Sequence, residues 1–140
     1  MALKSGPKII HSLRYRDAKA AIDFLRHGFG FEENLVVPGE GESIAHAQLI
    51  GHGGMIMLGS EPHEGPFGKI LKTPRALGGF VSASTYIVVD DPDAHYERAV
   101  AAGAEILMEI EDASYGCRGF SCRDLEGHVW SLGSYDPWAE

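Results

Sequence analysis

The feature that most constrains this chain is an internal repeat. When the sequence is shifted by 74 residues, Asp17 falls on Asp91 and Gly59 falls on Gly133 without a gap. Further matched pairs are Gly53 with Gly127, Ser60 with Ser134, Leu13 with Ile87, Tyr15 with Val89, Val36 with Ile110 and Leu58 with Leu132. Agreement over most of each half indicates two copies of one supersecondary unit.

Each copy of the unit reads as one strand, one helix and three further strands. Residues 8–15 and 84–89 have the composition of strands. Asp17 and Asp91 follow them, at positions where a carboxylate can cap a helix. Turn residues then separate three short strands in each copy, at 31–37, 44–49 and 55–58 and at 105–110, 118–123 and 129–132. We therefore expect an α+β fold of two tandem βαβββ modules.

The positions of the turn and cap residues predict one domain over residues 1–140. The first module runs from about residue 8 to 60 and the second from about 83 to 135. The connector at 61–82 is rich in proline and glycine. A connector of this length is either a functional lid or a passive linker, and the sequence leaves both open.

Composition excludes several classes of protein. The 140 residues include 12 Lys and Arg against 20 Asp and Glu, for a net charge of −8, which disfavours a nucleic-acid partner. No apolar run approaches the roughly 20 residues that span a bilayer, so we expect no membrane partner. The two cysteines are too few for a disulfide framework and fit a cytoplasmic protein.

Two stretches of the sequence are similar to the vicinal oxygen chelate superfamily, which includes glyoxalase I, extradiol dioxygenases and bleomycin-resistance proteins. The first is DAKAAIDFL from residue 17 with GFGF at 28–31, and the second is RDLEGHVW at 123–130, where Leu125 replaces the usual proline. The resemblance covers about residues 8–135. It implies that the two modules are half-barrels around a cavity. It also implies a homodimer, in which sheet edges find partners.

Metal-dependent members of this superfamily place one His, Glu or Gln ligand on the first strand and one on the last strand of each unit. By this resemblance the four positions are Ile10, Met57, Ser84 and Ser131. None of these side chains is a ligand that would hold a catalytic divalent cation. We therefore expect no metal and no other cofactor. His11 neighbours the first position and is a weak candidate, because a β-bulge could turn it inward.

Strand alternation indicates which side chains face the expected cavity. Leu13 and Tyr15 are apolar and are assigned to the helix side, so Ser12 and Arg14 face the cavity. An inward arginine can bind a carboxylate through two hydrogen bonds, pair with an internal carboxylate, or reach solvent. The other ligand-binding candidates are His46, Met57, Tyr86, Arg118 and Phe120.

Two classes of function fit these residues. The first is a bleomycin-resistance-like protein that binds a small amphipathic molecule without a metal, because aromatic and methionine walls suit such a ligand. The alternative is a lyase, isomerase or dioxygenase-type enzyme of the same superfamily. It would use an atypical metal site through His11 and His46, or metal-free acid–base chemistry. The four ligand positions favour the first.

Overall fold

The structure is a computed structural model that describes residues 5–62, 65–113 and 116–139. The first module contains β1 (His11–Tyr15), α1 (Ala18–Phe29), β2 (Glu32–Pro38), β3 (Ile44–Gly51) and β4 (Gly54–Ser60). The second contains β5 (Thr85–Val88), α2 (Pro92–Ala102), β6 (Glu105–Asp112), β7 (Arg118–Arg123) and β8 (Val129–Gly133). The connector holds two 3-10 helices, η1 (Pro66–Lys69) and η2 (Pro74–Leu77). The predicted α+β class and the two βαβββ modules are confirmed.

The helix boundaries follow from their caps. The carboxylates of Asp17 and Asp91 accept hydrogen bonds from the backbone N–H three residues later, at 3.1 and 3.2 Å. Gly30 and Gly103 end the helices with φ of 83° and 104°, in the left-handed region that glycine adopts without a steric cost. The same kinds of signal therefore begin and end both helices, and Asp17 and Asp91 cap them at the positions that the repeat predicted.

The strands form two sheets, with the orders β1-β4-β3-β2 and β5-β8-β7-β6. In each sheet the first strand pairs in parallel with the last strand of the same module. Leu13 lies opposite Leu58, and Ile87 lies opposite Leu132. Because these two pairs are 74 residues apart, the first and last strands of the modules are equivalent in register as well as in sequence.

The third strands of the two modules break this equivalence. Ala47 pairs with Leu58, whereas Phe120 pairs with Leu132. Ala47 and Phe120 are 73 residues apart, so the β7–β8 hairpin is one residue longer than the β3–β4 hairpin. Phe120 is therefore equivalent to Ala47, and not to His46 as the ungapped repeat indicates. A shift of one residue turns each side chain of a strand to the other face.

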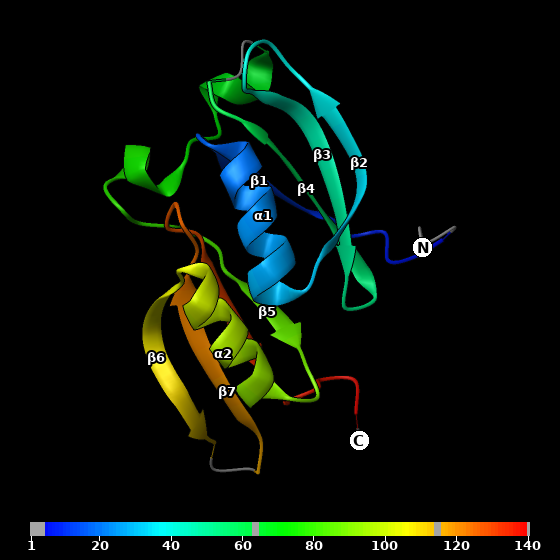
Figure 1. The fold of residues 1–140 in the computed structure, drawn as a ribbon, viewed down its shortest axis with the longest axis vertical. Coiled ribbons are helices and arrows are strands. Elements are labelled where there is room, and N and C mark those ends of the chain that lie inside the picture. Colours follow the sequence, from blue (N-terminus) through cyan, green and yellow to red (C-terminus); the bar gives the residue numbers. More distant parts are fainter. Residues whose placement is uncertain (1–4, 63–64, 114–115, 140) are drawn as a thin grey trace.

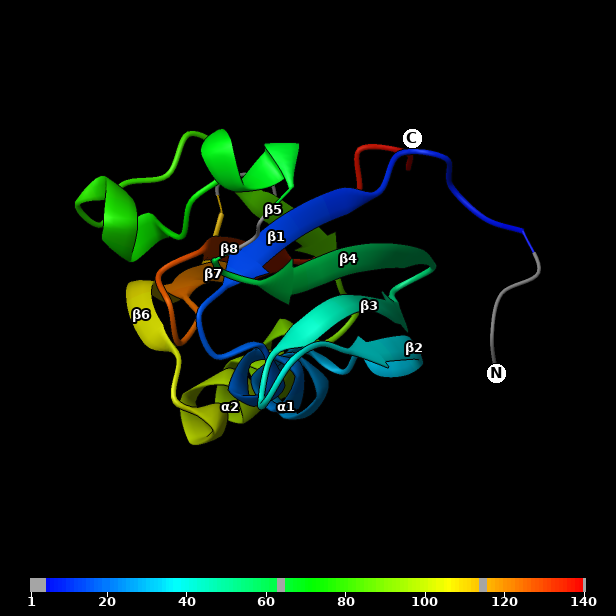
Figure 2. The same cartoon turned by 90° about the horizontal axis from the view of Figure 1, so that it is seen from above.

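The two helices meet where the modules contact each other. Figure 1 shows α1 above α2, with α1 next to the first sheet and α2 next to the second, and α1 contacts α2. Figure 2 shows both helices on one side of the strands and the connector on the opposite side. The face of each sheet turned away from the helices is called the open face below. The other face forms the core.

Asp124, in the turn between β7 and β8, joins the modules. It is only 5% exposed. Its Oδ2 accepts hydrogen bonds from the Tyr15 hydroxyl of the first module at 2.5 Å and from Nε1 of Trp130 at 3.0 Å. Its Oδ1 accepts from the backbone N–H groups of Glu126 and His128 at 3.0 and 3.1 Å. One buried carboxylate thus satisfies four donors.

Glu126 adds a second link from the same turn. Its two carboxylate oxygens accept hydrogen bonds from the backbone N–H groups of Arg16 and Asp17, at 2.6 and 2.8 Å, where β1 leads into α1. The Asp-Leu-Glu-Gly turn that resembles the superfamily's closing signature therefore holds the two modules together.

None of the helices in the described residues is both long and apolar enough to cross a bilayer.

Candidate ligand pockets on the open faces of the sheets

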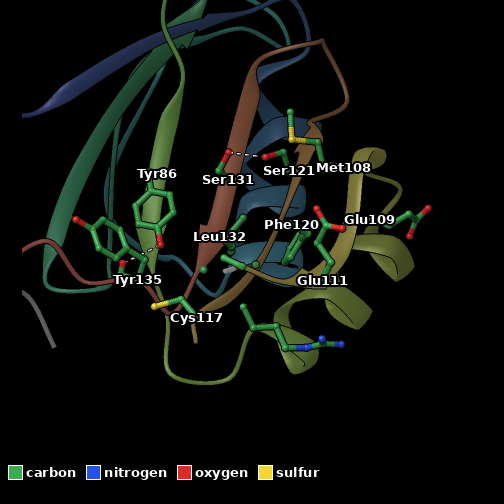
Figure 3. A pocket seen from close by; sticks show the side chains of 14 residues that line it. Tyr86, Met108, Glu109, Glu111, Cys117, Phe120, Ser121, Ser131, Leu132 and Tyr135 are labelled. Atoms are coloured by element: carbon green, nitrogen blue, oxygen red, sulfur yellow. Dashed lines mark hydrogen bonds between the residues drawn. The ribbon is translucent and has the colours of Figure 1, made fainter. Parts of the chain in front are cut away.

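The open face of the second sheet carries a pocket of about 280 Å³ (Figure 3). Tyr86 on β5 pairs with Ser131 on β8, and Ser131 shares a 2.6 Å hydrogen bond with Ser121 on β7. The Tyr86 hydroxyl donates to the carbonyl oxygen of Tyr135 at 2.8 Å. Met108 lies beside the serine pair in Figure 3 and is 65% exposed. The pocket therefore combines aromatic and thioether walls with two hydroxyl groups.

Glycines at matching positions of the repeat make room for a long polar side chain on each open face. A Cβ added at Gly59 would lie 2.5 Å from Nη1 of Arg14. A Cβ added at Gly133 would lie 2.8 Å from the hydroxyl oxygen of Tyr86. Both distances are too short for a real contact, so each glycine allows a side chain from β1 or β5 to lie over the adjacent strand.

Arg14 lies on the open face of β1, as strand alternation predicts, because its neighbours Leu13 and Tyr15 are buried on the helix side. Its Nη1 donates to the carbonyl oxygen of Ser60 at 3.5 Å. Its Nε is buried and has no hydrogen-bond partner among the described residues. Arg14 and Ser12 line a second pocket, of about 250 Å³, between β1 and the connector.

The seven predicted ligand-binding residues do not line one common pocket in the single chain. Tyr86, Arg118 and Phe120 line the pocket of the second sheet, and Ser12 and Arg14 line the pocket beside the connector. His46 and Met57 belong to the first sheet and line neither of these two pockets. The His46 ring contacts the side-chain amide of Gln48 on the same strand, with 3.1 Å between their Nε2 atoms.

Phe120 and Arg118 line the pocket of Figure 3, but their side chains point to the helix side and not to the open face that alternation predicted. Phe120 is 4% exposed, and its ring packs edge-on against Tyr96 of α2, at 5.2 Å between centroids. The Arg118 guanidinium forms ion pairs with Asp93 of α2 at 2.9 Å and with Asp112 at 3.2 Å. The cause is the longer β7–β8 hairpin, which gives β7 the opposite alternation from the one that the ungapped repeat assigned.

The same reversed alternation of β7 explains why Ser121 was not among the predicted ligand-binding residues. In the ungapped repeat it matches Ala47, which lies on the helix side and is fully buried. The extra residue in the β7–β8 hairpin would have placed Ser121 on the open face. Only the pairing of β7 with β8 reveals that residue.

His11 does not turn toward the open face. β1 and β4 pair without a register shift from His11 to Tyr15, so no bulge is present there. Partial burial, with a smaller effect of His128, lowers the pKa of His11. No group of three or more His, Cys, Asp or Glu side chains in the described ranges lies close enough to hold a metal ion.

A pair of histidines lies where the first module's β3–β4 turn meets the second module's helix. The rings of His52 and His95 are 5.5 Å apart, and His52 Nε2 lies 2.6 Å from the carbonyl oxygen of Phe29. Desolvation lowers the pKa of His95, with smaller effects of His52 and Arg98 in the same direction and an opposing effect of Asp91. The native state therefore favours the neutral His95 ring.

The lowered pKa of His95 predicts that the protein loses stability in mild acid. Because the native pKa of His95 is lowered below 6.5, the unfolded chain binds its proton first as the pH falls. The free energy of unfolding should be maintained above about pH 6.5 and decrease below it, and His95→Gln should flatten this decrease. Urea unfolding at a series of pH values measures both slopes, with His27→Gln as the control. Equal slopes for wild type and His95→Gln would contradict the prediction.

Comparisons with known proteins agree with this fold. A model of the Glyoxalase/Bleomycin resistance protein/Dioxygenase superfamily matches residues 8–132. The uncharacterized protein Mb0911c of Mycobacterium bovis is 36% identical over 133 residues, which cover 95% of this chain and 86% of that protein. The crystal structure of TioX from Micromonospora sp. ML1 is similar with a TM-score of 0.69 and 32% identity, over 91% of this chain and 98% of TioX.

A more distant structure shares the fold alone. FosX, a fosfomycin resistance protein of Listeria monocytogenes, superimposes with a TM-score of 0.64 at 15% identity, over 96% of this chain and 94% of FosX. The match of the superfamily model spans both βαβββ modules and the connector between them. The chain therefore belongs to the Glyoxalase/Bleomycin resistance protein/Dioxygenase superfamily.

Proposed function

We propose that this protein binds a small amphipathic molecule in the pocket of Figure 3, without a catalytic metal. The observation that carries the proposal is the hydroxyl pair of Ser121 and Ser131 beside the aromatic ring of Tyr86. Ser131 occupies a position where metal-dependent members of the superfamily carry a ligand. A hydroxyl pair at that position supports recognition by hydrogen bonds.

The walls of the pocket support an amphipathic ligand. Tyr86 is 44% exposed and Tyr135 is 46% exposed, so both offer ring surface to a flat apolar group. Met108 offers an adaptable apolar contact at the far end. A ligand with an aromatic part and one hydrogen-bonding group would therefore bury both parts in favourable surroundings.

The test is a thermal-shift screen of flat aromatic amphiphiles, followed by titration of the best compound. Ser131→Val should weaken its binding by about 3–10-fold, because one neutral hydrogen bond is lost. Ser43→Ala, in an exposed loop of the first module, is the control and should bind like wild type. Elemental analysis should find no stoichiometric metal. One metal ion per chain, or unchanged affinity in Ser131→Val, would contradict the proposal and favour the alternative of a metal-dependent enzyme.

A homodimer is the second part of the proposal. In the single chain the modules contact each other through their helices and through the β7–β8 turn, and their open faces are left to solvent. Large side chains on the second sheet's open face remain exposed, including Val88 at 36% and Met108 at 65%. A second copy that packs on these faces would cover them and bring His46 and Met57 of one chain near a pocket of the other. Sedimentation should give twice the chain mass of 15.1 kDa at micromolar concentration, and a monomer mass would contradict this part.

We also propose a cytoplasmic location. Cys117 and Cys122 are both free thiols in the structure. Burial, followed by the charge of Asp124, raises the pKa of Cys122 to about 12, so this thiol is a poor nucleophile. Unpaired cysteines fit a reducing compartment, and fluorescence microscopy of a tagged chain in the native host would test the location.

A further inference from the structure

We infer that the pocket between β1 and the connector is a second binding site, which takes an organic anion. The ligand would carry one carboxylate, sulfonate or phosphate group on an apolar body. β1, the connector and the β7–β8 turn form this pocket, whereas β5 to β8 and the segment after β8 form the pocket of Figure 3. The two pockets share no lining residue. The inference is therefore independent of the proposed function.

The charge of the lining is the first argument. Arg14 and Lys72 give this pocket two positive charges, and no Asp or Glu is among its lining residues. His11 and His128 also line it. The chain as a whole carries a net charge of −8, so a pocket without carboxylates is a local exception. The pocket of Figure 3, in contrast, has two glutamates in its lining. A positively lined pocket attracts an anion and disfavours a cation.

The unused hydrogen-bonding capacity of Arg14 is the second argument. Its Nε is buried without a partner, and neither Arg14 nor Lys72 forms an ion pair with a described residue. Arg118 shows the alternative in the same chain, since Asp93 and Asp112 bind its guanidinium. Buried donors are normally hydrogen-bonded, and an oxyanion would supply the missing acceptor to Arg14.

The connector holds Lys72 at the pocket. The next residue, Thr73, is fully buried, and its backbone N–H donates to the Glu61 carboxylate at 2.7 Å. The backbone N–H of Glu61 in turn donates to the carbonyl oxygen of Tyr15 in β1 at 2.8 Å. Two residues further, Arg75 donates from Nη2 to the carbonyl oxygen of Leu125 in the β7–β8 turn at 3.3 Å. This part of the connector is thus fixed at both modules. In this inference the connector is a wall of the pocket and not a passive linker.

The apolar surface around the pocket would contact the apolar body of the ligand. Ile70, Leu77 and Phe80 line the pocket and are 72%, 54% and 78% exposed. Large apolar side chains that are exposed together mark a binding surface more often than isolated ones do. An apolar body attached to the anionic group would cover these side chains while its charged end reaches Arg14 and Lys72.

The experiment compares two fluorescent probes that differ only in charge. Anilinonaphthalene sulfonate is an aromatic anion, and phenylnaphthylamine has the same rings without the sulfonate. The full chain should bind the sulfonate more tightly. Arg14→Ala should weaken sulfonate binding by about tenfold or more, and Lys72→Ala by a few-fold, while the affinity for the neutral probe stays unchanged. Arg14→Lys should fall between wild type and Arg14→Ala, because it keeps the charge but loses the planar fork.

Lys69→Ala is the matched control, because Lys69 belongs to the same connector but does not line the pocket. It should bind both probes like wild type. Circular dichroism and thermal unfolding establish that each variant is folded. The inference is overturned if Lys72→Ala and folded Arg14→Ala bind the sulfonate as tightly as wild type. It is also overturned if Lys69→Ala weakens binding as much as Lys72→Ala, or if both probes lose affinity equally in Arg14→Ala.

Discussion

Asp124→Ala is expected to lower the free energy of unfolding by about 3–5 kcal/mol. The substitution removes a buried carboxylate that accepts four hydrogen bonds. It leaves the Tyr15 hydroxyl and the Trp130 ring N–H without acceptors in the core, where an unsatisfied donor costs more than a hydrogen bond contributes on average. Burial, with Asp124 as the next cause, raises the pKa of Tyr15 well above its usual range, so its hydroxyl remains a donor at neutral pH.

Urea unfolding of a double-mutant cycle measures this effect. Tyr15→Phe alone should cost about 1–2 kcal/mol, because the carboxylate keeps its other three donors. The double variant should cost less than the sum of the single variants, because both remove the same hydrogen bond. A cost below about 1 kcal/mol for Asp124→Ala would mean that water satisfies these donors and that the turn does not hold the modules together.

Gly59→Ala and Gly133→Ala are each expected to destabilise the fold by about 1–3 kcal/mol through overpacking. At Gly59 the new Cβ would lie 2.5 Å from Arg14 Nη1 and 3.1 Å from the carbonyl oxygen of Ala45. At Gly133 it would lie 2.8 Å from the Tyr86 hydroxyl and 3.2 Å from the carbonyl oxygen of Arg118. Each substitution should therefore displace the polar side chain on the open face of its own module.

The two variants should differ in which pocket they disturb. Gly59→Ala should weaken binding of the anionic probe several-fold without removing a charge, whereas Gly133→Ala should leave it unchanged. Unfolding curves and probe titration measure both effects. Gly54→Ala is the control, because a Cβ there would meet only a carbonyl oxygen 4.0 Å away. If the three variants have the same stability and bind the probe alike, Arg14 and Tyr86 do not depend on the glycines.

The sequence determined the architecture because its signals are local and occur twice. Asp17 and Asp91 cap helices through atoms three residues away, and Gly30 and Gly103 end them by their own conformation. The open face of β1 also followed from alternation, since Leu13 and Tyr15 are adjacent to Arg14 and clearly apolar. The parallel pairing of the first and last strands of each module, in contrast, is known only from the structure.

Only the tertiary structure decided where most site residues lie. The face of β7 depends on one extra residue in the β7–β8 hairpin, and an ungapped repeat hides such a shift, so Phe120 and Arg118 were assigned to the wrong side. The distribution of the predicted ligand residues over separate pockets depends on how the modules pack through α1 and α2. The approach of Lys72 to Arg14 depends on contacts of the connector with both modules. These features rest on contacts between residues far apart in the chain, whereas local signals reach only a few residues.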